Sequence, residues 1–348
     1  MSLPAFSPQP TSLNFDRPQL LVVVDTEEEF DWARPFDRAS TGTVSIPAQD
    51  RAHAIYDRFG LVPTYVMDHP VATNPAAAAY LRRLVDAGRA DFGTHCHPWV
   101  TPPHLEAVTP FNSFHGNLPP ELEAAKLRAS TEAVAQAMGR APRIFKAGRY
   151  GLGPRTFDTL VDLGYTVDCS FVPHTSFAQQ DGPHFHGTPE TPFFTDTTQR
   201  LLEVPLTVGY SGAFAGLGRR YNGFVESPTA RSLRLPGIFS RLGWMERARL
   251  SPEGFDSTTQ CRLLRAMVQQ GTRVFTLSYH SPSLAPGYTP YVPDESALQD
   301  FLRCIETVLN YFKDELGGAF TTLSAIDRTA RAARVSAPSF ASASRTFS

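Results

Sequence analysis

Apolar residues along the chain fall into short uninterrupted runs that alternate with longer amphipathic segments. Residues 20–25 form a continuous apolar run that ends at an aspartate, which is the pattern of a strand buried on both faces. Residues 122–138 show the clearest helical periodicity, with apolar positions spaced along one face. The chain therefore begins as an alternation of strands and helices.

The same two patterns continue to about residue 323. Further strands are predicted at residues 63–67, 90–92, 143–147, 165–168, 201–205, 272–278 and 319–323. Further helices are predicted at residues 49–59, 74–87, 154–163, 257–270 and 295–312. Seven or eight strands that alternate with helices imply an α/β protein whose parallel sheet closes, or nearly closes, into a (β/α)7–8 barrel.

The pattern predicts one domain over residues 19–325, preceded by a tail at residues 1–18. Residues 326–348 contain mostly Ala, Ser and Arg without apolar periodicity, and we expect them to be disordered. Three long irregular segments interrupt the domain, at residues 98–120, 171–200 and 207–256. Each follows a predicted strand end, where a barrel builds its active site, so we expect them to form lids or binding loops.

Composition and charge reduce the number of functional classes that the chain can belong to. With 348 residues and 42% hydrophobic content, the chain can bury a large core, and its net charge of −2 gives no reason to expect nucleic acid as a partner. The four cysteines lack metal-type spacing and are expected to be free thiols in a reducing compartment. No signal-peptide pattern and no apolar run of membrane-spanning length is present. These features predict a soluble, cytoplasmic protein.

A pair of histidines follows the predicted strand that ends near residue 92. His95 and His97 are one residue apart, so on an extended backbone both imidazoles point to one side while Cys96 points away. Asp25 and Glu27 follow the first apolar run with the same spacing. Two imidazoles and a carboxylate are a typical ligand set for a catalytic divalent metal, with zinc the expected ion. The alternative is that the histidines are hydrogen-bonded loop residues.

Other polar side chains also follow apolar runs, and the carboxyl ends of barrel strands share one face. They are Lys146, Arg149, Tyr150, Asp168, Glu203 and His280. This set, in this order, resembles the NodB-type polysaccharide deacetylases of carbohydrate esterase family 4. The phrases DTEEEFDW, HCHPWVTPP, KAGRYGLG and LSYHSPSLAPG are similar to the divergent WalW-type branch, and the resemblance extends over residues 20–323. It implies the distorted barrel of that family.

The resemblance also implies roles for the first two motifs. Asp25 matches the general base and Glu27 the carboxylate metal ligand, although the usual motif has two adjacent aspartates, so Glu28 or Glu29 is an alternative ligand. His95 and His97 match the histidine ligands, but they are separated by one residue where the family has three.

The later motifs carry over in the same way. Lys146 occupies the position of the arginine that orients the base, with Arg149 as an alternative, and Tyr150 matches the aromatic residue of the groove. Asp168 matches the aspartate that supports the base, and His280 the histidine that protonates the leaving amine. Trp99 and Glu203 are further candidate substrate-binding residues.

The resemblance implies a metal-dependent hydrolase that removes an N-acetyl or O-acetyl group from a sugar or polysaccharide. Three alternatives remain open from the residues. The chain could hydrolyse a small amide that is not a sugar, or it could be a carbohydrate-binding relative without catalysis. A metal-free glycosidase using Asp25 and Glu203 would leave the histidine pair unexplained.

Overall fold

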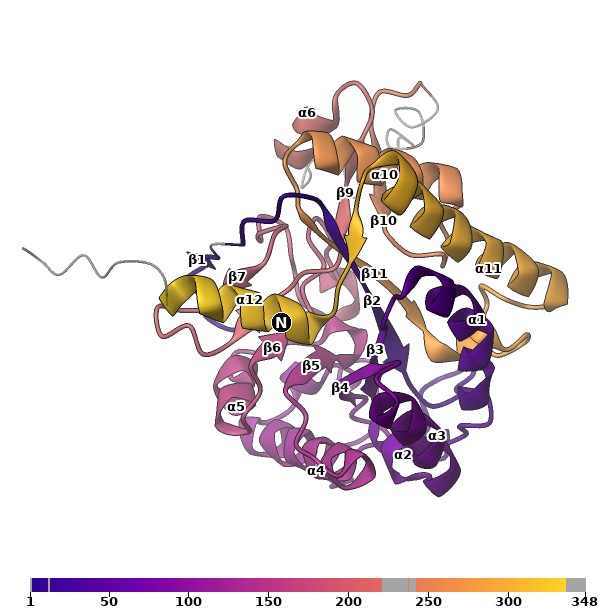
Figure 1. Cartoon of the computed structure of the whole chain (residues 1–348). Helices are drawn as coiled ribbons and strands as arrows, with labels where there is room; N and C mark the ends of the chain where they lie inside the picture. Colours follow the sequence, from indigo (N-terminus) through magenta and orange to yellow (C-terminus); the bar gives the residue numbers. More distant parts are fainter. Residues whose placement is uncertain (1, 12, 221–236, 238–241, 336–348) are drawn as a thin grey trace, which may run out of the picture.

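The structure, a computed structural model, describes residues 2–11, 13–220, 237 and 242–335. A ten-stranded sheet runs through it in the order β1-β7-β8-β6-β5-β4-β3-β2-β11, with β12 also paired to β2. The strands from β8 to β11 along this path are parallel, and β1 and β7 add antiparallel pairs at one edge. The predicted α/β class with a parallel sheet is confirmed (Figure 1).

The predicted apolar runs each contain or overlap a strand of this sheet, whereas β1 and β7 were not predicted and β4 extends to Cys96, beyond the predicted residues 90–92. The bounds of the strands are β1 Gln9–Pro10, β2 Gln19–Thr26, β3 Thr64–Met67, β4 Asp91–Cys96, β5 Ile144–Ala147, β6 Val167–Asp168, β7 Phe193–Phe194, β8 Leu202–Glu203, β11 Val274–His280 and β12 Ala319–Phe320. A separate antiparallel hairpin pairs β9 (Val208–Ser211) with β10 (Glu246–Arg249).

The helices surround the curled sheet, and most of them pack on its outer face (Figure 1). They are α1 Asp50–Phe59, α2 His69–Thr73, α3 Pro75–Asp86, α4 Pro120–Met138, α5 Thr156–Asp162, α6 Ala215–Arg220, α10 Ser257–Gln269, α11 Glu295–Asn310 and α12 Leu323–Val335. Local sequence sets their ends: Asn74 caps α3 by accepting two backbone N–H groups, and Gly60 ends α1 in the left-handed conformation.

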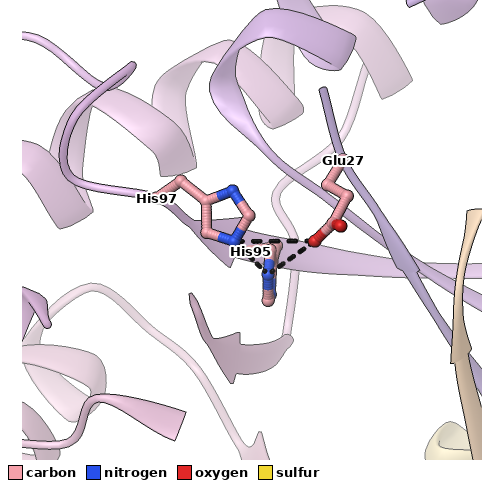
Figure 2. Close-up of side chains that lie close together, drawn as sticks. All are labelled: Glu27, His95 and His97. Atoms are coloured by element: carbon pink, nitrogen blue, oxygen red, sulfur yellow. Dashed lines mark hydrogen bonds and ion pairs between the residues drawn. The ribbon is translucent and has the colours of Figure 1, made fainter. Parts of the chain in front are cut away.

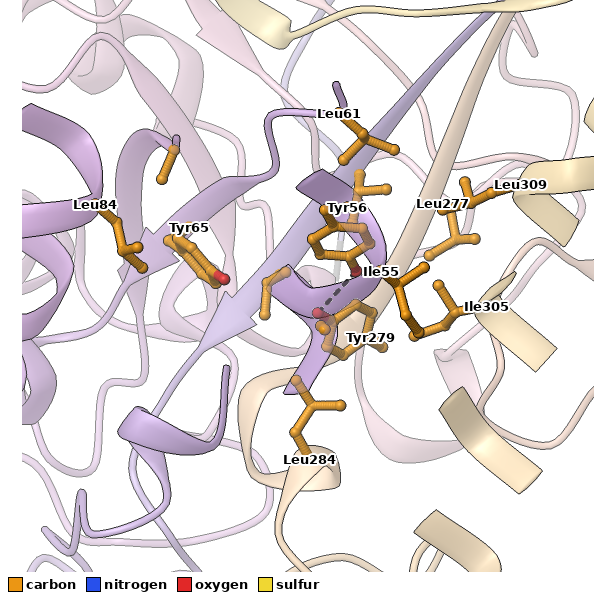
Figure 3. Close-up of a cluster of buried hydrophobic side chains, with 14 of the residues drawn as sticks. Ile55, Tyr56, Leu61, Tyr65, Leu84, Leu277, Tyr279, Leu284, Ile305 and Leu309 are labelled. Carbon is orange, nitrogen blue, oxygen red and sulfur yellow. Dashed lines mark hydrogen bonds between the residues drawn. The ribbon is translucent and has the colours of Figure 1, made fainter. Parts of the chain in front are cut away.

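The core between sheet and helices is continuous on the outer face. Figure 3 shows side chains of α1, β11 and α11 meeting there, among them Ile55, Leu277 and Ile305. Tyr56 and Tyr279 are fully buried in this cluster, and their hydroxyl groups satisfy each other through a hydrogen bond of 2.9 Å.

A second cluster fills the inner side of the sheet. Leu21 and Val23 of β2 contribute to it with Ile144 of β5 and Val167 of β6. Because side chains alternate along a strand, the next inward positions after Val23 and Ile144 are Asp25 and Lys146. The polar site therefore lies on top of this inner apolar cluster, at the carboxyl ends of the strands.

The two sides of the sheet approach each other, but no regular strand pair joins them among the described residues. Beyond β8, the backbone N–H of Thr207 donates to Thr276 of β11 at 3.3 Å, and Ser278 of β11 donates to Leu250 at 3.2 Å. Among the described residues, β11 thus meets the far edge of the sheet through single hydrogen bonds. The observed architecture is a curled parallel sheet, and the predicted distorted barrel stays a prediction.

Helix α12 covers the amino-terminal ends of strands in this sheet. The sequence predicted disorder from residue 326, but α12 continues to Val335. Ile326 and Ala330 are buried in the inner cluster, and Arg331 donates to the backbone oxygens of Thr166 and Arg200. Ile326 and Ala330 make these apolar contacts, and two such positions in an Ala- and Arg-rich segment do not give a recognisable helical pattern in the sequence. Residues 336–348 lie outside the described part of the chain.

The predicted irregular segments also contain short regular elements. The segment 171–200 includes β7, which pairs with β1 from the predicted amino-terminal tail. The segment 207–256 includes the β9–β10 hairpin, and its residues 221–236 and 238–241 are outside the described residues. All described helices are too short or too polar to traverse a lipid bilayer.

Candidate active site

Strand register brings the polar side chains together at the carboxyl ends of the strands. Asp25 on β2 is the register partner of His280 on β11, and His95 on β4 is the partner of Lys146 on β5. Partners in a parallel sheet point to the same side. These four side chains therefore lie at one end of the inner cavity, although they are far apart in sequence.

A cavity of about 420 Å³ opens at this end of the sheet. Asp25, Glu27, His95, His97 and His280 lie in its lining, together with a wall of aromatic side chains. A concave site with a few convergent polar groups and an apolar wall is the usual form of a small-molecule site.

Glu27, His95 and His97 point toward one another (Figure 2). The two Nε2 atoms are 3.2 Å apart, and Oε2 of Glu27 lies 3.7 Å from Nε2 of His95 and 3.5 Å from Nε2 of His97. All three side chains are buried. Around a tetrahedral ion with bonds of about 2.1 Å, ligand atoms lie roughly 3.4 Å apart, so this spacing suits a single metal ion.

The hydrogen bonds of the outer ring nitrogens fix the tautomers. Nδ1 of His95 is 2.9 Å from the carbonyl oxygen of Lys146, and Nδ1 of His97 is 2.8 Å from Oε2 of Glu28. Each Nδ1 must carry a proton to donate to these acceptors. Burial lowers the pKa of His95 well below its usual range and that of His97 to about 4, so both rings are neutral. Each Nε2 therefore presents a lone pair.

Three lone-pair donors thus face one another in a buried space. Burial, with Glu28 and Asp25 nearby, raises the pKa of Glu27 well above its usual range, and Oε1 of Glu27 has no hydrogen-bond partner among the described residues. Such an arrangement is unfavourable unless a cation lies between the donors. The residues present fit a divalent metal, and two imidazoles with one carboxylate are a donor set that zinc accepts.

Glu28 lies behind the histidines, on the Nδ1 side of His97, and not among the facing donors. Its carboxylate also accepts the indole N–H of Trp99 at 2.8 Å. Burial raises the pKa of Glu28 to about 7, and burial together with Glu28 raises that of Asp68 well above its usual range. Asp68 caps α2 and accepts the backbone N–H of Glu28 at 2.8 Å. Glu28 is therefore an orienting group for His97, and Glu27 is the carboxylate placed to bind the metal.

Asp25 and Lys146 form a buried ion pair beside this group. Nζ of Lys146 lies 2.5 and 2.6 Å from the two carboxylate oxygens of Asp25. Burial alone would raise the pKa of Asp25, but the charge of Lys146, with His95 and His280, lowers it to about 2. Asp25 is therefore ionised at neutral pH.

His280 completes the polar end of the cavity. Its Nε2 is 3.8 Å from Oδ2 of Asp25, and its Nδ1 is 2.7 Å from Oε2 of Glu253. The same carboxylate accepts the backbone N–H of His280 and the hydroxyl of Ser283. Glu253 thus fixes the ring so that Nε2 faces the cavity, in the way that a carboxylate orients a catalytic histidine.

Three other predicted site residues, Arg149, Tyr150 and Trp99, also line this cavity. Lys146, and not Arg149, contacts Asp25; Arg149 instead donates to Ser113 and to Gln180. Arg149 and Tyr150 are both left-handed, with φ of 52° and 60°, and such strained backbone is common at functional sites. Trp99 lines the cavity but is largely buried, and its ring stacks on His97 with centroids 4.2 Å apart.

Asp168 and Glu203 are not brought to the cavity. Asp168 is the register partner of Phe145, whose side chain is on the outer face of the sheet, and of Glu203 on β8. Asp168 accepts the hydroxyl of Ser170, and Glu203 accepts the backbone N–H of Phe171. The inward positions of these strands are occupied by Val167, Cys169 and Leu202.

Sequence reasoning missed two functional neighbours. Glu253 lies in a long segment with no strand pattern, so nothing near it in sequence links it to His280. Gly148 follows β5, and a Cβ there would lie 2.2 Å from the backbone oxygen of Cys96 and 2.5 Å from Cδ2 of His97. The KAGRYG phrase did contain a signal, because a glycine directly after a strand can mark close approach of another backbone.

The fold matches solved structures over nearly the whole chain. A Mycobacterium smegmatis protein assigned as a polysaccharide deacetylase superposes with a TM-score of 0.51 at 15% identity, over 97% of this chain and 99% of that one. Puue allantoinase superposes with a TM-score of 0.53 at 14% identity, over 94% and 95% of the two chains. A protein from Pseudomonas aeruginosa PAO1, also assigned as a polysaccharide deacetylase, gives 0.51 at 13% identity over 89% and 90%.

These comparisons establish which fold the chain has. The sequence matches no family model and no curated protein. The chain has the fold of the polysaccharide deacetylases and of this allantoinase, so the predicted resemblance is confirmed at the level of the fold. Membership of the WalW-type branch stays a prediction.

Proposed function

We propose that the chain is a metal-dependent hydrolase that removes an acetyl group from an N-acetylated sugar. The observation that carries the proposal is the meeting of Glu27, His95 and His97, whose ligand atoms face one another within the spacing of a single ion. The fold shared with polysaccharide deacetylases supports the same reaction class.

Glu27, His95 and His97 would hold the ion through one carboxylate oxygen and two Nε2 atoms. A divalent ion such as zinc supplies Lewis-acid polarisation of the substrate carbonyl and makes bound water more acidic. The backbone oxygen of Lys146 accepts a hydrogen bond from Nδ1 of His95, and the carboxylate of Glu28 accepts one from Nδ1 of His97. These bonds keep both Nε2 atoms directed at the ion.

Asp25 is the proposed general base. Its carboxylate is ionised at neutral pH, so it can accept the proton of the attacking water. The ion pair with Lys146 holds the carboxylate in place, and it also makes the carboxylate a weaker base.

His280 is the proposed general acid. Glu253 anchors Nδ1, which leaves Nε2 to donate a proton to the departing amine on the Asp25 side of the cavity. Hydrolysis of the amide would then release acetate and an amino sugar.

A carbohydrate substrate is supported by the aromatic wall of the cavity. Trp32, Phe36 and Tyr150 lie in the lining and are only partly buried. Aromatic faces of this kind suit the apolar faces of sugar rings. Trp99 is the least available of them, because its ring is already stacked on His97.

The test is the metal content of the purified protein after incubation with zinc. We expect about one equivalent in the wild type and none in a His95→Ala/His97→Ala variant. His184 and His186 form a second His-x-His pair in a loop outside the cavity lining, so the matched control is His184→Ala/His186→Ala, which should keep the metal. Absence of metal from the wild type would overturn the proposal. Acetate release from N-acetylglucosamine tests the reaction itself.

A second candidate is hydrolysis of a small amide that is not a sugar. A cavity of about 420 Å³ is sized for a small molecule, and the fold likeness to an allantoinase favours this class. Parallel assays with allantoin and N-acetylglucosamine separate the two. Turnover of allantoin alone would favour the second candidate.

A further inference from the structure

Three arginines lie around the cavity beyond the proposed catalytic groups. Arg34, Arg149 and Arg249 are all in its lining, and Arg149 and Arg249 are partly buried. Arg249 is the last residue of β10, so a strand fixes its backbone at the cavity. No role in the proposed hydrolysis requires these three charges.

Arg249 has no carboxylate partner among the described residues. The one hydrogen bond of its side chain among these residues runs from Nη1 to the hydroxyl of Tyr150, at 2.9 Å. A guanidinium has five N–H donors, and a neutral hydroxyl uses one of them without balancing the charge. If Arg249 served only to hold Tyr150, the remaining donors and the charge would be left facing the cavity.

Tyr150 and the charges of Glu253 and Asp25 raise the pKa of Arg249. Among the described residues, however, neither carboxylate forms an ion pair or hydrogen bond with it, because both are bound by other groups. Asp25 is bound by Lys146, and Glu253 accepts hydrogen bonds from His280 and Ser283. Glu27 faces the two histidines. Arg249 therefore presents guanidinium N–H donors at the cavity without a directly bound carboxylate among the described residues.

Arg149 is held as a second cation on the same wall. Its guanidinium carbon lies 4.1 Å from the ring centroid of Phe114 and 5.1 Å from that of Phe36. Its hydrogen bonds go to the neutral groups of Ser113 and Gln180. These contacts orient the guanidinium and again leave its charge unbalanced among the described residues.

Asp31 and Arg34 are the remaining charged groups of the lining, and both are exposed. Asp31 accepts the backbone N–H of Ala33, and its charge offsets at most one arginine. Unpaired arginines in a partly enclosed cavity are suited to bind a planar carboxylate or a phosphate, since their forked donors match both.

We infer that the substrate carries an anionic group, a carboxylate or a phosphate, that binds Arg249 and Arg149 while the acetamide lies at the metal site. The inference rests on the proposed function and narrows its substrate class. A neutral glycan would leave both guanidinium groups at the cavity without a directly bound anion, so the preferred substrate is a small acidic N-acetylated sugar.

The experiment compares matched N-acetylated sugars with the zinc-loaded full chain. Acetate release is measured for N-acetylglucosamine, N-acetylglucosamine 6-phosphate and N-acetylmuramic acid, which are neutral, phosphorylated and carboxylated. We expect kcat/KM for one acidic sugar to exceed that of the neutral sugar by about tenfold or more, mainly through KM. Which acidic sugar is preferred distinguishes phosphate from carboxylate recognition. The preference should decrease as salt is raised.

Arg249→Gln is expected to reduce this preference to about twofold or less, and Arg249→Lys to keep part of it. Arg265 is the matched control, because it also donates to a tyrosine hydroxyl, that of Tyr311, but is outside the cavity lining. Arg265→Gln should keep the full preference. Equal kcat/KM for acidic and neutral sugars, or a preference unchanged in Arg249→Gln, would overturn the inference and leave the proposed function in place.

A calorimetric titration with the same three sugars separates the two proposals if none is hydrolysed. Tighter binding of an acidic sugar than of N-acetylglucosamine, lost in Arg249→Gln, would support the anion site although the proposed reaction had failed. Absence of any binding preference would overturn the inference without reference to turnover.

Discussion

Two clusters of buried acids lie at strand ends in different parts of this sheet, and they differ in what surrounds them. Asp25 and Glu27 are on the inner side, beside Lys146, two histidines and a cavity. Asp168 and Glu203 are on the outer side, where they meet each other and are enclosed by the core. Both clusters come at strand ends, so position along the strand does not distinguish them.

The difference between the clusters is the side of the strand to which each acid points. An acid that points inward at a strand end faces the cavity, where its carboxylate can interact with solvent, substrate or a cation. An outward acid is covered by helices, and burial together with the neighbouring carboxyl raises the pKa of Glu203 well above its usual range. A shift of one residue along a strand separates the two environments.

The largest contrast is expected from neutralising one acid of each cluster. Asp25→Asn should lower kcat by about 10³-fold, because it removes the proposed base, while zinc content is retained. Asp168→Asn should leave kcat within about threefold, because its side chain is on the opposite face of the sheet. Steady-state acetate release measures both.

Asp25→Asn also leaves the charge of Lys146 buried without its partner, which can destabilise the fold. Urea unfolding of each variant therefore accompanies the assay. Equal losses of turnover in Asp25→Asn and Asp168→Asn, at equal stability, would show that the two clusters do not differ as described.

A smaller effect should follow from a change that disturbs only the inner cluster. The methyl group of Gly148→Ala would overlap the backbone oxygen of Cys96 and the ring of His97. We expect a loss of about 1–3 kcal/mol in the free energy of unfolding and a decrease of about tenfold or more in zinc affinity. Chelator competition measures the affinity.

Gly216→Ala is the control for this substitution, since a Cβ at Gly216 has no neighbour within 4 Å and the residue lies in helix α6. It should leave zinc affinity unchanged and stability unchanged or slightly higher. Normal zinc affinity in Gly148→Ala would mean that His97 tolerates displacement and that the inner cluster is less rigid than its contacts indicate.

The smallest effect is a pH dependence of stability that belongs to the outer cluster. The pKa of Asp168 is raised by burial, and that of Glu203 is raised by burial and by Asp168. A folded-state pKa above the unfolded value of about 4 means that the folded state keeps the proton longer. The stability that the protonated pair contributes is thus complete below pH 4 and is lost as pH rises toward the folded-state pKa.

The amide that Glu203→Gln introduces cannot ionise, so this variant should lose less stability than the wild type as pH rises. We expect the free energy of unfolding of the wild type, relative to the variant, to fall as the pH is raised above about 4 in urea titrations. A difference that stays constant with pH would mean that the pair does not share a proton.

The alternation of apolar runs was sufficient to predict the strands and helices that frame the site. Continuous apolar strands and capped helices are local features, and β2, β4, β11 and α4 all lie where the pattern placed them. Convergence of His95 and His97 followed from the period of a strand, and their Nε2 atoms are indeed adjacent.

The remaining features depend on contacts that no local pattern encodes. Asp168 and Glu203 were grouped with the site because they end apolar runs, but which face they occupy depends on register with β5. Glu253 meets His280 through a segment without periodicity. Helix α12 is ordered by a few contacts with distant strands, and Arg249 is aligned by a hairpin that lies within a predicted irregular segment.

The central position of β2 has a consequence for how the protein folds. β2 pairs with β3 nearby in sequence, but its other neighbours are β11 and β12, and Glu27 donates its backbone N–H to Ser281 across 254 residues. Contacts between such distant segments form late, because the intervening chain must first be closed into a loop. During refolding, the helices and β3–β5 should therefore form before Asp25 meets His280, and activity should return later than helical circular dichroism.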